Sequence, residues 1–108
     1  MSGSDPSVRT TGTGTGRGND DCRKRFETVL GTPVPVVVAR LSQSQLLDVV
    51  KIDDPIRGVV AQTIDGQIVG AITRDIAGLR RCIDRGVLYE AEVIRVTGGS
   101  VTVEVRNQ

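Results

Sequence analysis

The residues best suited to chemistry are arginines, and three of them have a spacing that would bring them together. Twelve of the fourteen basic residues are Arg, the exceptions being Lys24 and Lys51. Arg74, Arg81 and Arg85 lie at i, i+7 and i+11, which on a helix is one stripe about 16 Å long. Guanidinium groups bind phosphate through a rigid, bidentate fork. The spacing therefore predicts an outward stripe that contacts phosphates; the alternative is the solvated face of an ordinary amphipathic helix.

The other reactive side chains show no catalytic or metal-binding pattern. The chain has no His, which excludes Ser-His and Cys-His pairs and imidazole metal sites. Asp53 and Asp54 precede Pro55, as is typical of a turn. Cys22 and Cys82 are too few for a disulfide scaffold, and we interpret them as a helix residue and a part-buried small hydrophobe. We expect no enzyme, no metal and no small-molecule cofactor.

Length and charge bound the possible partners. The chain has 108 residues, enough for one domain, with 14 Lys+Arg against 13 Asp+Glu. A net charge of +1 argues against a histone-like polycation but is compatible with a local basic patch. No apolar run approaches the ~18 residues of a membrane span, and no secretory signal is visible, so we expect a cytoplasmic protein without a membrane partner.

The first half of the chain predicts a tail and three elements. Residues 1–20 are rich in Gly, Ser and Thr and predict a disordered tail, followed by a single domain at 21–108. Asp20 or Asp21 could cap a short N-terminal helix with Cys22, Phe26, Val29 and Leu30 on one face. The range 34–41 predicts a strand, and 45–52 suits either a helix turn or a strand.

The second half predicts two hairpins around a helix. Asp65-Gly66 is a favoured type I′ turn pair, and Gly98-Gly99 joins the ranges 87–97 and 100–105. A bulge near Val93-Ile94 would bring Tyr89, Ala91 and Val93 to the inner face. Between the hairpins a helix is predicted over about 73–85, capped by Thr73 and ended by Gly86, with Gly78 in the same stripe as the arginines and Arg80 on its flank.

These elements predict a mainly β (α+β) fold. We expect a small antiparallel β-barrel or curled sheet of five or six strands, with the helix across it. The side chains expected inside are Ile72, Ile76, Leu79, Ile83, Val60, Val69 and Val101.

The range 64–105 resembles the HIRAN domain. The letters DGQIVGAITRDIA at 65–77 are similar to the family's strand DGxxVGYIPR, which runs into a helix, and IDRG at 83–86 followed by YEAEV at 89–93 is also similar. The resemblance implies a small β-barrel that binds single-stranded or 3′-ended DNA, with Arg74 at the family's "PR" position. The chain lacks the family's Asn and Tyr before the hairpin and aromatic residues near the first strand.

Two functions are consistent with these patterns. The first is a nucleic-acid-binding module that contacts phosphates. Its candidate contact residues are Arg40, Lys51, Arg57, Arg74, Arg81, Arg85 and Tyr89, the last because single-strand binding uses aromatic platforms. The alternative is a non-enzymatic protein-interaction domain, a subunit of a larger complex, in which an exposed Val-rich strand edge pairs with a partner protein.

Overall fold

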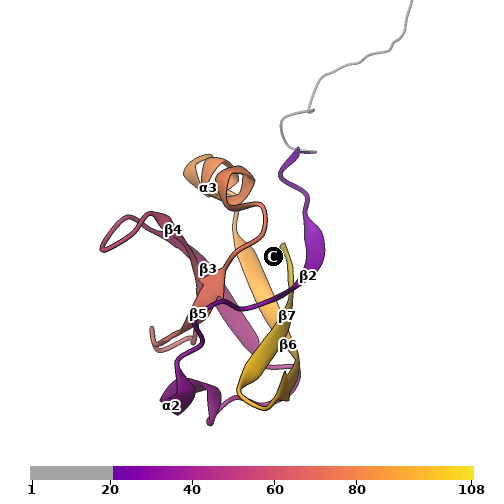
Figure 1. Ribbon diagram of the computed structural model, residues 1–108. Coiled ribbons are helices and arrows are strands. Elements are labelled where there is room, and N and C mark those ends of the chain that lie inside the picture. Colours follow the sequence, from indigo (N-terminus) through magenta and orange to yellow (C-terminus); the bar gives the residue numbers. More distant parts are fainter. Residues whose placement is uncertain (1–20) are drawn as a thin grey trace, which may run out of the picture.

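The computed structural model describes residues 21–108, so the tail predicted for 1–20 lies outside the described residues. Six strands and two helices follow one another in this part of the chain (Figure 1). Their bounds are β2 (Arg25–Val29), α2 (Pro35–Val38), β3 (Leu46–Ile52), β4 (Gly58–Gln62), β5 (Ile68–Ile72), α3 (Ile76–Asp84), β6 (Tyr89–Thr97) and β7 (Ser100–Asn107).

The strands form one antiparallel sheet that curls on itself. Its order is β2-β7-β6-β3-β4-β5. Just after β2, Gly31 and Ala71 exchange two backbone hydrogen bonds of 2.8 Å, and the N–H of Val34 donates to the carbonyl of Val69 at 2.8 Å. These bonds join the segment after β2 to β5, the opposite edge of the sheet. The predicted small, mainly β fold with a curled antiparallel sheet is confirmed.

The two helices lie at opposite ends of the curled sheet (Figure 1). The single turn of α2 lies at one end, and α3 lies at the other, beside the loop that joins β3 to β4. Among the described residues, no helix is both long and apolar enough to cross a membrane.

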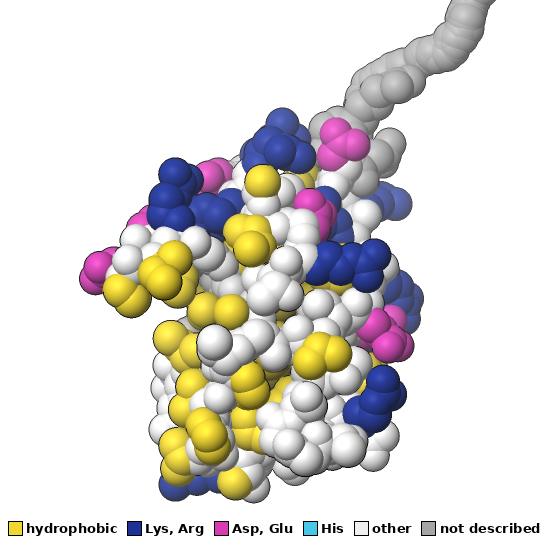
Figure 2. Space-filling model, viewed as in Figure 1, with side chains coloured by type: hydrophobic (Ala, Val, Ile, Leu, Met, Phe, Trp, Pro, Cys, Tyr) yellow, Lys and Arg dark blue, Asp and Glu magenta, His cyan; other side chains and the backbone are white. Residues whose placement is uncertain are grey.

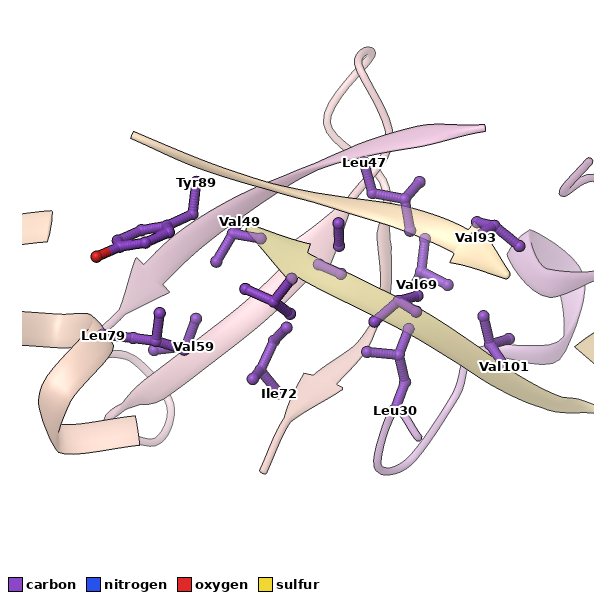
Figure 3. Packing of buried hydrophobic residues seen from close by; sticks show 14 of the residues in the cluster. Leu30, Leu47, Val49, Val59, Val69, Ile72, Leu79, Tyr89, Val93 and Val101 are labelled. Atoms are coloured by element: carbon purple, nitrogen blue, oxygen red, sulfur yellow. The ribbon is translucent and has the colours of Figure 1, made fainter. Parts of the chain in front are cut away.

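The interior is filled mainly by valine. Figure 3 shows Leu79, Tyr89 and Val59 toward one end of this packing, Ile72 near its middle, and Val93 and Val101 toward the other end. The core cluster comprises Cys22, Leu30, Val37, Val38, Leu47, Val49, Val59, Ala61, Val69, Ile72, Leu79, Cys82, Tyr89, Ala91, Val93, Val101, Val103 and Val105. Burial in the core is confirmed for Ile72, Leu79, Val69 and Val101. Val60 is buried too but lies outside the core cluster. Ile83 is only partly buried, and Ile76 is 36% exposed, so the prediction that Ile76 lies inside is wrong.

The N-terminal helix predicted for 21–30 is wrong, because its central residues form β2. Residues four apart share a face in a strand as well as in a helix, so Cys22, Phe26 and Leu30 fit both patterns. Pairing decides between them: β2 lies antiparallel to β7 over five residues, from Arg25 opposite Arg106 to Val29 opposite Thr102.

The strand predicted for 34–41 is also wrong. Pro35 occupies the first turn of α2, where its missing N–H costs nothing and its fixed φ suits a helix. Val37 and Val38 then reach the core from this helix despite their β propensity. The ambiguous range 45–52 is resolved as a strand, since β3 lies between β4 and β6 in the middle of the sheet.

Both predicted hairpins are confirmed, although one turn differs in type. Gly98 and Gly99 have φ of +56° and +85°, as the type I′ turn between β6 and β7 requires. At the other turn only Gly66 has a positive φ, +91°, and the N–H of Thr63 donates to the carbonyl of Gln67 at 2.9 Å. This turn therefore has three residues, 64–66, one more than the predicted Asp65-Gly66 pair, and Gly66 takes the bulge position.

The predicted bulge in β6 is confirmed. The register against β7 shifts between Val93 and Arg95, so that Val93 rather than Ile94 lies opposite Val103. Tyr89, Ala91 and Val93 consequently face inward, and each is 2% exposed or less.

The two cysteines form a disulfide, contrary to the prediction of two unrelated thiols. Their Cα atoms are 5.5 Å apart, and the bond links residues separated by 60 positions. Cys22 lies three residues before β2 and Cys82 lies in α3, so the bond ties the start of the described residues to that helix. The carbonyl of Cys22 also accepts hydrogen bonds from the Tyr89 hydroxyl and from Nδ2 of Asn107.

Candidate nucleic-acid interface

The start of α3 decides which arginines share a face. The helix begins at Ile76, after Asp75 in a left-handed conformation (φ +56°), and not after the predicted cap Thr73. Gly78 is buried, and a Cβ there would lie 2.4 Å from Oδ1 of Asp75. Gly78 thus allows the Asp75 side chain to pack against the helix and leaves no opening for a phosphate.

Arg74 lies outside the helix and does not continue the predicted stripe. Its Nη1 donates to the carbonyl of Glu27 at 3.2 Å, and its Cζ lies 5.1 Å from the centre of the Phe26 ring. These contacts direct Arg74 toward β2. The one-face stripe of Arg74, Arg81 and Arg85 is therefore wrong in its first member, because the left-handed Asp75 interrupts the helical spacing.

A different group of arginines surrounds one depression at the α3 end of the molecule. Arg57, Arg80, Arg81 and Arg85 line an open hollow of about 760 Å³, together with Ile76, Ala77 and Asp84. We call this the basic depression. In Figure 2, Lys and Arg side chains gather over this end of the molecule. Arg57 comes from the β3–β4 loop, so the depression combines residues that are far apart in the sequence.

Two acidic residues at the depression are paired, one with a base outside its lining and one with arginines of the lining itself. Asp84 is paired with Lys51 of β3. Asp53 lies 2.5 Å from Nη2 of Arg80 and 3.8 Å from Nε of Arg57. The hydrogen bond from Arg80 holds the pKa of the Asp53 carboxyl below its usual value. Arg57, which is 77% exposed, is therefore only loosely paired and can contact a ligand.

Arg80 is buried and holds the β3–β4 loop against α3. Its Nη1 donates to the carbonyls of Ile52 at 2.7 Å and of Gly58 at 2.9 Å, the two residues that flank the loop. The side chain is 11% exposed. The sequence predicted that Arg80 lies on the flank of the helix. Helix periodicity could not indicate the role of Arg80, because its partners are main-chain atoms of other elements.

The remaining predicted contact residues lie elsewhere or are engaged. Arg40 is exposed just after α2, at the opposite end of the sheet from α3. Lys51 is half-buried and paired with Asp84. The Tyr89 ring is 2% exposed, and burial raises the pKa of its hydroxyl. A ring buried to this degree cannot stack on a base, so Tyr89 is wrong as a contact residue.

Three glutamates lie close together on the outer face of β6 and β7. Arg106 binds Glu90 at 3.0 Å, Glu92 at 2.6 Å and Glu104 at 3.0 Å, and Arg25 adds a 3.2 Å contact to Glu104. Hydrogen bonds from Arg25 and Arg106 lower the pKa of Glu104. Over the described residues, no group of His, Cys, Asp and Glu is suited to hold a metal ion.

Comparison of the chain with protein-family models, with curated proteins and with solved structures gives no match.

Proposed function

We propose that the protein is a nucleic-acid-binding module whose basic depression contacts the phosphates of a single strand. The observation that carries the proposal is that four guanidinium groups line one open hollow, while its lining carboxylate, Asp84, is paired with Lys51. Planar guanidinium forks suit phosphate oxygens, and an open surface can follow a flexible backbone. The contact residues are Arg57, Arg81 and Arg85, with Arg80 as the residue that positions the loop.

The lack of an exposed aromatic platform determines what kind of binding we expect. Tyr89 is buried, and Phe26 is partly buried beneath Arg74. Binding should therefore depend mainly on phosphate contacts, be steeply salt-dependent and show little sequence preference. The HIRAN resemblance and the absence of enzymatic activity remain predictions. The cytoplasmic location also remains a prediction. The Cys22–Cys82 disulfide argues against it, because disulfides persist mainly in oxidising surroundings.

The alternative, in which an exposed Val-rich strand edge pairs with a partner protein, remains a prediction. The range 34–41 does not supply such an edge, because it contains the helix α2. A protein partner would have to use another surface.

Replacing Arg57, Arg81 and Arg85 together with Ala should weaken binding to a short fluorescein-labelled DNA strand without lowering the melting temperature. Each phosphate contact on a single strand contributes about 0.7 to the salt slope, so the slope should fall by about two units. Fluorescence polarisation at a series of salt concentrations measures both quantities.

The matched control replaces Arg23, Arg40 and Arg95 with Ala. These three arginines are exposed outside the depression, and the control makes the same change in net charge. Its affinity should fall far less. Equal losses in the two triple variants, or wild-type protein without salt-sensitive binding, would exclude the basic depression as the site.

A further inference from the structure

A second candidate site, which is apolar, lies on the outside of the sheet beside the basic depression. Val60 is 5% exposed, yet of the buried hydrophobic side chains in the described residues it is the one outside the core cluster. Its neighbours Val59 and Ala61 belong to the core, so Val60 points to the outer face of β4. There it lies in an apolar groove of about 370 Å³.

Branched aliphatic side chains form the rim of this apolar groove and are exposed to solvent. Ile56 is 74% exposed, Ile68 is 43% exposed and Ile76 is 36% exposed, and all three line the groove with Ile52. Figure 2 shows hydrophobic side chains gathered over the β3–β4 loop and down the same side of the molecule. A contiguous exposed apolar patch of this kind is typical of an interaction site.

The rim is held in place by the protein itself. Arg80 binds the carbonyls of Ile52 and Gly58, one on each side of the loop that carries Ile56. One buried side chain thus fixes both ends of the loop. Such preorganisation reduces the conformational entropy that a ligand must offset on binding.

The charge around the groove indicates the chemistry of its occupant. Arg57 is the charged residue in its lining, and the nearest carboxylate, that of Asp53, is bound more closely by Arg80. The side-chain polar groups in the lining besides Arg57 are the hydroxyls of Thr32 and Thr73, too few to read the edge of a base. The groove therefore favours an aliphatic group attached to a carboxylate.

We propose that this groove docks an extended acidic segment of a partner protein, which inserts a branched aliphatic side chain over Val60 and pairs a carboxylate with Arg57. Charge complementarity supports this occupant, since Arg57 also faces the basic depression and none of the acidic residues within 21–108 lines the groove. The chain's own residues 1–20 contain one branched aliphatic residue, Val8, and suit the groove poorly. This interaction goes beyond the proposed nucleic-acid binding and uses the isoleucines rather than Arg81 and Arg85.

The test is a titration of the ¹⁵N-labelled protein with the capped peptide Asp-Leu-Asp-Ile-Asp, followed by amide chemical shifts. Shifts should concentrate at Ile56, Gly58, Ile68 and Ile76. Control peptides with Lys in place of Asp, or Ser in place of Leu and Ile, should cause no such shifts. Replacing both Ile56 and Ile68 with Ser should weaken peptide binding about tenfold or more.

A matched control variant is Ile64→Ser, since Ile64 is 85% exposed in the β4–β5 turn and does not line the groove. It should bind the peptide as the wild type does. The proposal is overturned by equal loss in this control, by equal shifts from the three peptides, or by no shifts. It is also overturned if shifts at the groove grow with protein concentration alone.

The two proposals fail separately in these experiments. Replacing Arg81 and Arg85 with Ala should weaken DNA binding and leave peptide binding unchanged, while the Ile56 and Ile68 double variant should do the reverse.

Discussion

Replacing Cys22 and Cys82 with Ala should lower the free energy of unfolding by about 4 kcal/mol, the expected effect of opening a cross-link across 60 residues. The bond restricts the unfolded chain, so its loss makes unfolding entropically more favourable. A small domain has about 5–15 kcal/mol of stability in total, and a loss of this size should lower the melting temperature by about 15–30 °C.

Urea and thermal unfolding of the oxidised wild type and the double variant provide the measurement. Wild-type protein unfolded in a dithiol reductant should match the variant, whereas the variant itself should not respond to the reductant. A transition midpoint unchanged by removal of both cysteines would show that the Cys22–Cys82 bond does not form or does not constrain the chain.

Replacing Arg80 with Met should cost about 2–4 kcal/mol, because the carbonyls of Ile52 and Gly58 lose a charged donor at a part-buried site. Met retains the apolar stem, so the loss reports the hydrogen bonds. The part of Arg80's contribution to stability that comes from its pairing with Asp53 should depend on pH. The folded-state pKa of Asp53 is lowered, so its pairing with Arg80 stabilises the protein above pH about 4 and is lost as the pH falls through that lower pKa.

Urea unfolding at neutral pH measures this loss, and hydrogen exchange of amides 53–58 reports on the loop. In the variant these amides should exchange faster than in the wild type, while the amides of β6 and β7 change less. The replacement Arg81→Met is the control, since Arg81 is exposed on the same helix. Equal stability of the Arg80 and Arg81 variants would contradict the role assigned to Arg80.

Local signals in the sequence predicted the second half of the fold well. The Gly98-Gly99 turn, the bulge at Val93-Ile94 and the helix stop at Gly86 depend on backbone conformations that few residues adopt, and such requirements are visible in the sequence. The inward positions of β6 followed from the bulge. The curled sheet followed from the two hairpins.

Features that depend on distant pairing could not be predicted in the same way. Residues 25–29 form a strand because β7, some 70 residues later in the chain, is there to pair with them. The disulfide needs α3 to lie beside Cys22, and no spacing rule for two cysteines contains that information.

The candidate site could be predicted only in part, because some of its residues are brought together by contacts between distant elements. Arg81 and Arg85 share the exposed helix face that periodicity indicated, and Arg57 joins them. Arg74 does not, because the left-handed conformation of Asp75 could not be read from a helical wheel. The role of Arg80 depends on hydrogen bonds to main-chain carbonyls of other elements, which no helical spacing indicates.

The most direct test of the central claim is to map where a single strand contacts the protein. A ¹⁵N-labelled sample titrated with a short DNA strand at low salt should show amide and arginine Nε–Hε shifts concentrated at Arg57, Arg81 and Arg85 and along α3. Shifts confined to the α2 end around Arg40, shifts confined to the β6–β7 face around Arg106, or no shifts with saturating DNA would contradict phosphate binding at the basic depression.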